Sequence, residues 1–468
     1  MEEKKKLIRI TTKTCKACIV QMEIMRRVMP QFPDMEIEDL DRKEDAERVK
    51  EYDIHGVPFL KLGDATLTGS HTMAQTKAFL RGELSDDIIE SGIEHPHYLD
   101  NSATTAVCQE AIDAAVHVMA EEFGNPSSVH YKGRSAKKLL YRSRQKIAES
   151  IEAEAGEIFF TSCGSESDNW AILKAAEMMS EKGRHIISST AEHDAVRKSL
   201  DFLEDRGFEI SRLTPNESGQ VSAEDVRAAL RPDTILVSLM LVNNETGAVN
   251  DIEGISKMLK AENSGALLHT DAVQGYMKMP WTAEKLGADL ISMSGHKIHA
   301  PKGIGILYIK KGLELPPLIL GGGQEDGHRA GTESLPLIAA LAAAVEAAEA
   351  DLDGSISRMK AFKEQILTRL ERELPALEYI KSEAAHIINI SIPGTKSETV
   401  LNFLSDRGVY VSNSSACKRG AKSHVLEAIG KSDDYIGGAI RISLSRMTSQ
   451  EDIDALCETL IEAAAVLR

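Results

Sequence analysis

The chain is poor in aromatic residues and has fewer positive than negative charges. Phe, Trp and Tyr make up 4% of the 468 residues, so few side chains can stack on nucleic-acid bases. Lys and Arg number 55 against 72 Asp and Glu, which leaves a formal charge of −17. Such a charge repels phosphate backbones, and we therefore expect no nucleic-acid partner.

Long hydrophobic runs and abundant cysteine are missing as well. The most apolar stretch, residues 335–350, is interrupted by Pro336 and Glu346, so we expect no transmembrane helix and no membrane partner. The N-terminal segment is charged and carries no apolar secretion signal. Six cysteines are too few for a disulfide scaffold in a chain of this length, and a cytoplasmic location is expected.

The length predicts two or three domains. The polar, acidic segment 82–97 is typical of a linker, and it separates a small domain (residues 1–81) from a large one (residues 98–468). At 42% hydrophobic residues, a chain this long can bury an ample core.

In the large domain, apolar strands alternate with amphipathic helices. The predicted strands are 158–161, 185–189, 208–213, 235–240, 266–270, 290–293 and 304–309. This alternation predicts an α/β fold with a mostly parallel sheet covered by helices. Later short strands at 387–392, 409–411 and 439–444 indicate a smaller second lobe.

Lys297 and Asp271 each follow or end a predicted strand of this sheet. Ligands bind at the carboxyl ends of the strands in α/β folds. A lysine that can form a Schiff base and a carboxylate that can hold a pyridinium nitrogen are the pair that pyridoxal phosphate requires. Taken alone, Lys297 is more typical of a solvated loop residue.

An anion site is expected nearby, because residues 160–166 (FTSCGSE) follow a strand and open a helix. Small residues at a helix N-terminus leave backbone N–H groups free to bind a phosphate. An ordinary serine N-cap is the alternative for this motif. His193, at the start of the next predicted helix, is a candidate for stacking on a flat cofactor or for capping the helix.

These segments belong to a series of ordered motifs that resembles the NifS/IscS-type cysteine desulfurases. The motifs are YLDNSATT (98–105), GNPSS (124–128), TSCGSESDN (161–169), AEH (191–193), VNNETG (242–247), HTDAVQ (269–274), SGHKIHAPKG (294–303) and AGT (330–332). The resemblance implies a homodimeric pyridoxal-phosphate enzyme of fold type I. Its large domain would span about residues 112–350, and its small lobe residues 98–111 plus 351–468.

The resemblance also implies roles for individual residues. The implied cofactor-binding residues are Gly164, Ser165, His193, Asn244, Asp271, Gln274, Ser294, His296, Lys297 and Thr332. Lys297 would bind the cofactor and move the Cα proton, and His193 would stack on the ring. Arg441 and Asn125 would bind the substrate, and Thr332 would reach the phosphate from the second subunit.

Cys417, in the run SNSSACKRG, is the implied nucleophile. Its small polar neighbours predict an exposed loop, and Lys418 and Arg419 favour the reactive thiolate. An inert buried thiol is the alternative reading of an unpaired cysteine. The loop after Cys417 is shorter than in the family, and Cys163 stands where the family commonly has glycine. Two further cysteines, Cys108 and Cys457, have apolar neighbours and are expected to pack in the core.

The small domain carries a CxxC pair, Cys15 and Cys18, between a predicted strand and a predicted helix. Its predicted strands are 7–11, 35–40, 57–62 and 65–69, and its predicted helices are 16–29, 43–52 and 72–81. A helix N-terminus favours a thiolate at Cys15, whereas half of a zinc site is the competing interpretation. With the candidate cis bond Val57-Pro58, this pattern resembles a glutaredoxin/thioredoxin-like domain.

The sequence therefore predicts a pyridoxal-phosphate-dependent cysteine desulfurase that converts L-cysteine to L-alanine and forms a persulfide on Cys417. Cys15 would attack the persulfide and Cys18 would resolve it, or the small domain would only dock partners. The final sulfur acceptor would be an iron–sulfur scaffold or a tRNA-thiolation protein. Alternatives are a selenocysteine lyase, an aminotransferase that does not need Cys417, and a thiol–disulfide oxidoreductase or sulfur-relay scaffold.

Overall fold

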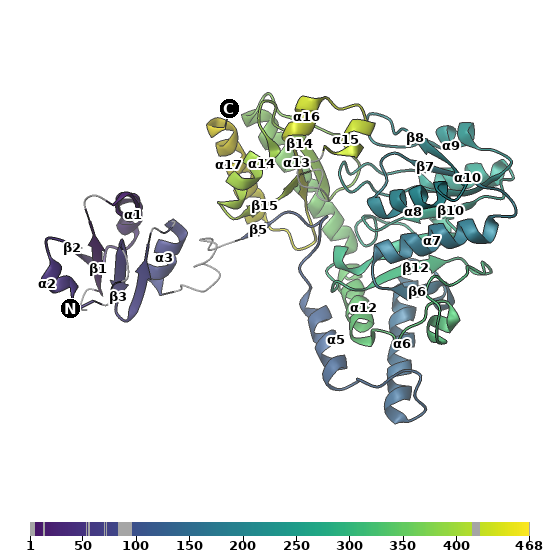
Figure 1. Ribbon diagram of the computed structural model, residues 1–468, viewed down its shortest axis with the longest axis horizontal. Helices are drawn as coiled ribbons and strands as arrows, with labels where there is room; N and C mark the ends of the chain where they lie inside the picture. Colours follow the sequence, from purple (N-terminus) through teal and green to yellow (C-terminus); the bar gives the residue numbers. More distant parts are fainter. Residues whose placement is uncertain are drawn as a thin grey trace. The chain divides into compact units, whose positions relative to one another are not determined.

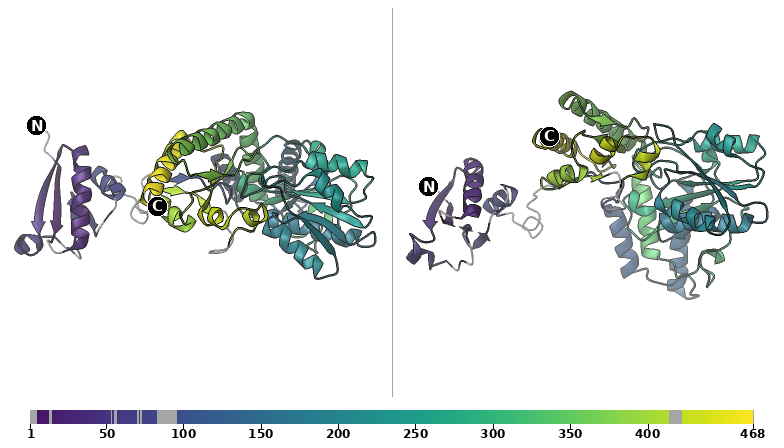
Figure 2. Two further views of the ribbon diagram at one scale, coloured as in Figure 1. Left: turned by 90° about the horizontal axis from the view of Figure 1, so that it is seen from above. Right: turned by 45° about the horizontal axis from the view of Figure 1, so that its top comes forward.

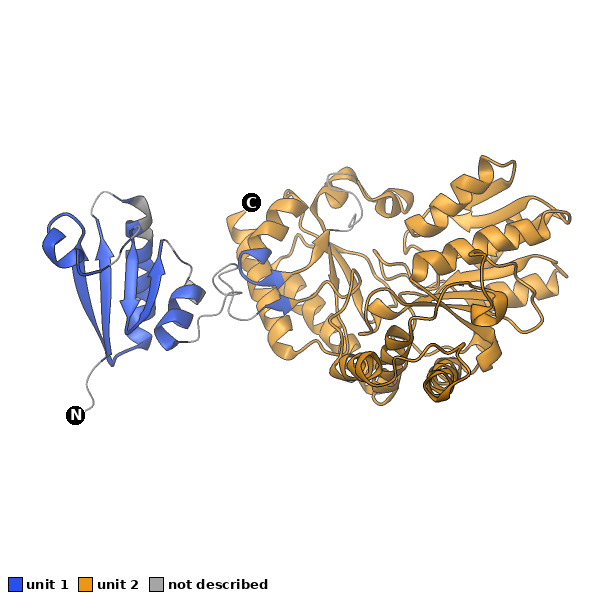
Figure 3. Ribbon diagram, turned by 60° about the horizontal axis from the view of Figure 1, so that its bottom comes forward, with its two compact units in different colours: residues 1–97, 405–409 blue, residues 98–404, 410–468 orange. Residues whose placement is uncertain are grey.

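A computed structural model of the protein describes residues 5–12, 15–52, 54, 57–69, 71, 73–82, 96–413 and 422–467. The chain forms two compact units, residues 1–97 with 405–409 and residues 98–404 with 410–468 (Figure 3). Cys417 and most of the predicted linker, residues 83–95, lie outside the described residues. Within the described ranges, no helix is long and apolar enough to cross a membrane.

The first unit is built on a four-stranded sheet in the order β2-β1-β3-β4. Its elements are β1 (Lys5–Thr11), α1 (Lys16–Val28), η1 (Met29–Gln31), β2 (Met35–Asp41), α2 (Ala46–Val49), β3 (Phe59–Leu62), β4 (Ala65–Thr68) and α3 (Met73–Arg81). Strand β1 pairs in parallel with β2 and antiparallel with β3. Leu7, Met25, Leu60 and Phe79 form the buried core between sheet and helices.

The elements of this unit follow the sequence prediction closely, and the Val57-Pro58 bond is cis. Only the helix expected over residues 43–52 is too long, because α2 is a single turn. The carboxylate of Asp41 accepts hydrogen bonds from the backbone N–H groups of Lys43 (2.8 Å) and Glu44 (3.2 Å). This local turn takes the place of the first helical residues.

The second unit contains a seven-stranded sheet in the order β6-β12-β11-β10-β9-β7-β8. Its strands are β6 (Ile158–Thr161), β7 (His185–Ser189), β8 (Glu209–Leu213), β9 (Thr234–Ser238), β10 (Leu267–Asp271), β11 (Leu290–Ser294) and β12 (Gly305–Ile309). All neighbours are parallel except those of β12, which runs antiparallel to β6 and β11. The predicted mostly parallel sheet is confirmed.

Helices cover this sheet on both faces (Figures 1 and 2). They are α5 (Gln109–Ala120), α6 (Tyr131–Glu149), α7 (Gly164–Met179), α8 (Asp194–Glu204), α9 (Ala223–Ala229), α10 (Ile252–Ala261), α11 (Ala283–Leu286) and α12 (Leu335–Glu349). Helix α7 packs across the strands through fully buried side chains such as Trp170. Helices α5, α6 and α12 pack together as a separate layer.

The C-terminal part of this unit forms a second sheet in the order β13-β14-β17-β16. Its elements are α13 (Leu352–Glu373), β13 (Glu378–Tyr379), β14 (Ile387–Ser391), α14 (Ser397–Ser405), β16 (Ser412–Asn413), α15 (His424–Ala428), α16 (Asp433–Gly438), β17 (Ala439–Ser443) and α17 (Gln450–Val466). The short strands β5 (His97–Tyr98) and β15 (Val409–Tyr410) pair separately. The predicted strands 387–392 and 439–444 correspond to β14 and β17. Cys108 and Cys457 are buried, as expected.

Candidate active site

A cavity of about 350 Å³ lies at the carboxyl ends of β10 and β11, beside the N-terminus of α7. Ten of the predicted cofactor- and substrate-binding residues line it: Gly164, Ser165, His193, Asn244, Asp271, Gln274, Ser294, His296, Lys297 and Arg441. Thr332 and Asn125 are not among the lining residues, and both are exposed. Asn125 instead accepts a hydrogen bond from the backbone N–H of Ser127 at 2.8 Å.

Lys297 ends the short helix η3 (Gly295–Lys297), which follows β11 directly. Its Nζ donates hydrogen bonds to the backbone carbonyls of Ser102, at 2.6 Å, and Ala103, at 2.7 Å. Both carbonyls belong to the segment before α5, which carries the predicted motif YLDNSATT. This segment therefore fixes the amine inside the cavity.

Asp271 is the last residue of β10 and is 7% exposed. Its Oδ1 accepts a hydrogen bond from the backbone N–H of Val273 at 2.9 Å. Burial raises the pKa of the carboxyl, while His193, the Val273 N–H and Lys297 act in the opposite direction. A cationic group in the cavity would stabilise the charged form further.

His193 caps a helix, which is one of the two roles that the sequence left open, and stacking on a cofactor stays a prediction. Its Nδ1 accepts a hydrogen bond from the backbone N–H of Ala195 at 3.1 Å, so it caps helix α8. The same side chain lines the cavity, with Asp271 and Lys297. Capping fixes the position of the ring at the cavity wall.

The end of the cavity at α7 is suited to an anion. Gly164 begins this helix, and a Cβ there would lie 2.8 Å from a methyl carbon of Val273, so only glycine leaves the turn open. The buried Ser294 hydroxyl has no hydrogen-bond partner in the part of the chain that the structure describes. Burial, and then the positive charges of Lys297 and other lysines, lower the pKa of His296 to about 4.

Arg441 of β17 also lines the cavity and is 2% exposed. Its Nη2 donates to Asp100 Oδ1 at 2.8 Å and its Nη1 to the carbonyl of Asn244 at 3.0 Å. The buried Nε makes no hydrogen bond to any described residue. The guanidinium is thus held rigidly and retains a donor for a carboxylate.

Sequence reasoning missed Asp168, which lies one helical turn after Gly164 and also lines the cavity. It is 1% exposed, and burial, followed by repulsion from Asp271, raises its pKa well above the usual value. The sequence could have indicated Asp168, because it lies four residues after Gly164 and therefore on the same face of the predicted helix. The Ser102 and Ala103 carbonyls gave none, because backbone atoms leave no mark in a sequence.

Comparison with known proteins identifies the family. The model for "Aminotransferase class-V" matches residues 97–456. The chain belongs to the aminotransferase class-V family. The thioredoxin-like character of residues 1–81 lies outside this match and stays a prediction.

Curated relatives of this class-V chain include cysteine desulfurases from Methanosarcina thermophila and Dictyoglomus turgidum, both named IscS. Each is 40% identical over 79% of this chain, and the match covers 92% and 95% of the respective relatives. A solved structure titled "NIFS-LIKE PROTEIN" superposes with a TM-score of 0.76 at 35% identity, covering 80% of this chain and all of that one. Its fold is therefore shared by this protein.

The class-V family uses pyridoxal phosphate, and the residues of the cavity fit this group. The Asp271 carboxylate suits a pyridinium nitrogen, and the Lys297 amine suits an aldehyde. The turn at Gly164 and the unpartnered Ser294 hydroxyl suit a phosphate. Cys163 is half-buried at the same turn, at the N-terminus of α7, and also lines the cavity.

Glu192, directly before His193, provides a test of the electrostatics. It is 1% exposed, accepts hydrogen bonds from Ser189 Oγ and the Met240 N–H, and burial raises its pKa to about 8. The unfolded carboxyl has a pKa of about 4.3, so the folded state binds the extra proton between about pH 4.3 and about pH 8. The stability that this proton confers is fully present below about pH 4.3 and is lost as the pH rises through about 8.

Glu192→Gln should therefore flatten the decline of stability with pH. We expect the variant to match the parent near pH 5 and to exceed its unfolding free energy at pH 9 by at least about 1.4 kcal/mol, the value of one pKa unit. Urea unfolding at both pH values measures this, with the exposed Glu217→Gln as control. A variant that loses stability as steeply as the parent would contradict the assignment.

Proposed function

We propose that the protein is a pyridoxal-phosphate-dependent cysteine desulfurase that converts L-cysteine to L-alanine and takes the sulfur onto Cys417. The observation that supports this most is the single cavity lined by Lys297, Asp271 and Arg441. It lies in a chain whose curated relatives, matched over more than nine-tenths of their length, are named cysteine desulfurases.

The chemistry divides between the cofactor and the chain. When bound, pyridoxal phosphate withdraws electrons from the substrate Cα. The Lys297 amine takes and returns the Cα proton, and the carbonyls of Ser102 and Ala103 orient it for this step. Arg441 binds the substrate carboxylate, and Asp100 holds the guanidinium in place.

The sulfur transfer is assigned to Cys417. Its thiolate attacks the substrate sulfur, an S–S bond forms, and the Cβ–S bond breaks with its electron pair moving to carbon, which takes up a proton. The products are alanine and a Cys417 persulfide, so atoms and electrons balance without an added oxidant. Cysteine desulfurases pass this sulfur to acceptor proteins, and we propose an iron–sulfur scaffold or a tRNA-thiolation protein here.

The residues that flank the Cys417 segment support this assignment. Before it, Ser412 of β16 pairs directly with Arg441 of β17. After it, Ser423 caps α15 and donates a hydrogen bond to Glu245, the neighbour of Asn244 in the sequence. Residues 414–421 thus connect two points that are tied to residues of the catalytic cavity.

Cys417→Ser should abolish persulfide formation and leave cofactor binding intact. We expect the loaded variant to keep the colour of the parent and to release alanine at least about 100-fold more slowly, because a hydroxyl is a far weaker nucleophile at neutral pH. Mass spectrometry after incubation with L-cysteine locates the added sulfur. Cys457→Ser, at a buried thiol, is the control. An unchanged rate of alanine release would refute the assignment of Cys417 as the nucleophile.

We also propose a homodimer, which would bring Thr332 of one subunit towards the phosphate of the other. Helices α5 and α6 and their connection expose many large apolar side chains. These are Ile112 (41% exposed), Val116 (54%), Met119 (59%), Phe123 (69%), Val129 (88%), Tyr131 (72%) and Tyr141 (59%). A patch of this kind favours a protein interface.

Met119→Glu should weaken this dimer, because it places a charge within the apolar patch. We expect the parent to elute as a dimer in size-exclusion chromatography with light scattering, and the variant to shift towards the monomer mass. Val466→Glu, at a 62% exposed site on α17, should leave the mass unchanged. A monomeric parent would rule out the homodimer.

For the small domain we propose a persulfide-reducing role. Cys15 is half-buried and its sulfur accepts a hydrogen bond from the Cys18 N–H at 3.3 Å, while Cys18 is fully buried. Burial raises the pKa of Cys18, so Cys15 is the attacking thiol. Cys15 takes the outer sulfur from the persulfide, and Cys18 then displaces it as sulfide by forming a disulfide with Cys15. An external thiol reduces this disulfide for the next turnover.

Cys15→Ser should therefore slow sulfide release without changing persulfide formation. In the parent, one equivalent of L-cysteine should yield sulfide and an oxidised CxxC pair without added thiol. In Cys15→Ser, the persulfide should persist on Cys417. Persulfide lifetimes, followed by alkylation and mass spectrometry with Cys108→Ser as control, measure this. Equal lifetimes in variant and parent would contradict the relay.

A further inference from the structure

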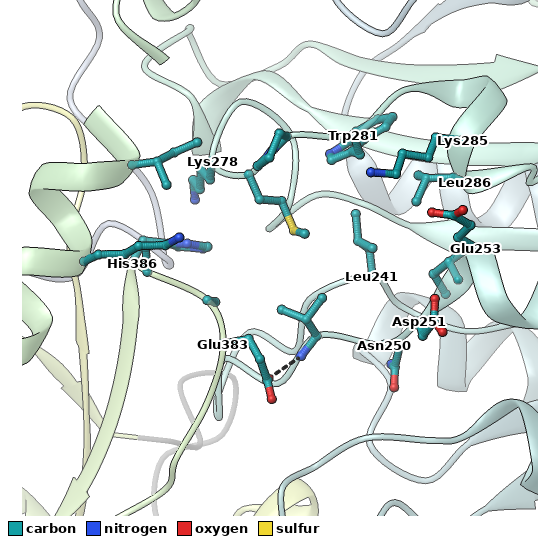
Figure 4. A pocket seen from close by; sticks show the side chains of 18 residues that line it. Leu241, Asn250, Asp251, Glu253, Lys278, Trp281, Lys285, Leu286, Glu383 and His386 are labelled. Atoms are coloured by element: carbon teal, nitrogen blue, oxygen red, sulfur yellow. Dashed lines mark hydrogen bonds between the residues drawn. The ribbon is translucent and has the colours of Figure 1, made fainter. Parts of the chain in front are cut away.

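A second cavity, of about 410 Å³, lies outside the catalytic one (Figure 4). Its walls include residues 278–281, 285 and 286, which follow β10, residues 249–253 at the start of α10, and residues 383–386, which precede β14. The volume falls within the range of small-molecule sites. Neither the catalytic chemistry nor the sulfur transfer described above uses this cavity.

One end of the cavity presents two buried nitrogen-bearing side chains. His386 is 1% exposed and Lys278 is 6% exposed, and both lie at the same end of Figure 4. The backbone of Gln274 lies close to the imidazole, yet neither ring nitrogen of His386 forms a hydrogen bond within the described ranges. An unsatisfied buried imidazole costs free energy, so a ligand that bonds it would stabilise the folded protein.

The carboxylates that line the cavity do not neutralise this end. Glu383 accepts hydrogen bonds from the Val249 N–H and the Gln220 side chain. Glu253 pairs with Lys257, and Asp251 caps α10 and lies, with Glu253, at the far end of Figure 4. Burial and the charges of Lys297 and Arg441 lower the pKa of Lys278 well below the usual value, and an anion at this end would counteract both effects.

The remaining walls are apolar. Leu241, Met279, Trp281 and Leu286 are among the residues that line the cavity. Exposed Lys360 adds positive charge at the rim. One ammonium and one imidazole can satisfy the two oxygens of a carboxylate, and the apolar walls match a hydrocarbon or aromatic body.

The cavity is also connected to the catalytic site. Lys278 Nζ donates to Gln274 Oε1 at 3.2 Å, and Gln274 Nε2 donates to the Ser102 carbonyl at 2.9 Å. The same carbonyl accepts the hydrogen bond from Lys297. A ligand oxygen bound to Lys278 would compete with Gln274 for the Lys278 amine. It would thereby change the hydrogen bonding of Gln274, which lines the cofactor cavity.

We propose that this second cavity binds a small organic carboxylate with an apolar body, and that Lys278 and Gln274 transmit its binding to the catalytic cavity. Binding itself does not depend on the proposed desulfurase activity. The transmission is reciprocal, so the carboxylate changes the affinity for the cofactor by the same factor by which the cofactor changes the affinity for the carboxylate.

Isothermal titration of the cofactor-loaded full chain with benzoate, 3-phenylpropionate and octanoate tests the site. At least one of them should bind once per chain, and its neutral amide should bind about tenfold more weakly or not at all. His386→Leu, which keeps the volume and removes both nitrogens, should weaken binding about tenfold. If none of the three binds, or the amide binds as well as the acid, the site is refuted.

Lys360→Glu decides the question if His386→Leu fails to fold, because residue 360 is exposed. This substitution should lower the affinity for the carboxylate several-fold. Lys310→Glu, at an exposed residue on another part of the unit, should leave that affinity unchanged. Equal affinity for the carboxylate in the parent and in Lys360→Glu would overturn the proposed binding site. A saturating carboxylate that leaves the dissociation constant of pyridoxal phosphate unchanged would overturn the transmission, whatever the catalytic activity of the protein.

Discussion

The two hydrogen bonds from Lys297 to the carbonyls of Ser102 and Ala103 are the constraint on which the catalytic cavity depends. They join the carboxyl end of the parallel sheet to the segment before α5. The same segment is fixed from the other side, because Ser443 Oγ of β17 accepts the Ser102 N–H at 2.8 Å. Strand β17 also carries Arg441, so the lysine and the arginine are positioned by one continuous network.

A second feature of the site is a concentration of buried carboxyl groups. Asp168, Glu192 and Asp271 are all nearly inaccessible, and burial raises the pKa of each. Asp168 lies in α7, Glu192 lies just before α8 and Asp271 ends β10. Cationic groups such as Lys297 only partly offset the cost of burying the Asp271 carboxylate. The site therefore favours a cationic ring, and this preference does not rest on any single hydrogen bond.

The sequence predicted the sheet well, because strands such as β6 (IFFT) and β12 (GILYI) are largely apolar runs that a buried sheet accommodates. The sequence also placed Asp271, which ends β10, and Lys297, which follows β11 by three residues, at the carboxyl ends of strands. It failed for α2, where hydrogen bonds from backbone N–H groups to the Asp41 carboxylate outweigh helical periodicity. The second cavity was not predictable, because His386 and Lys278 come together only through the tertiary fold.

Borohydride reduction of the protein loaded with pyridoxal phosphate, followed by peptide mass spectrometry, tests the central claim most directly. Lys297 should carry the pyridoxyl group, because the Ser102 and Ala103 carbonyls hold its amine in the cavity that Asp271 also lines. Modification of Lys278 in place of Lys297, or of no lysine at all, would contradict the account.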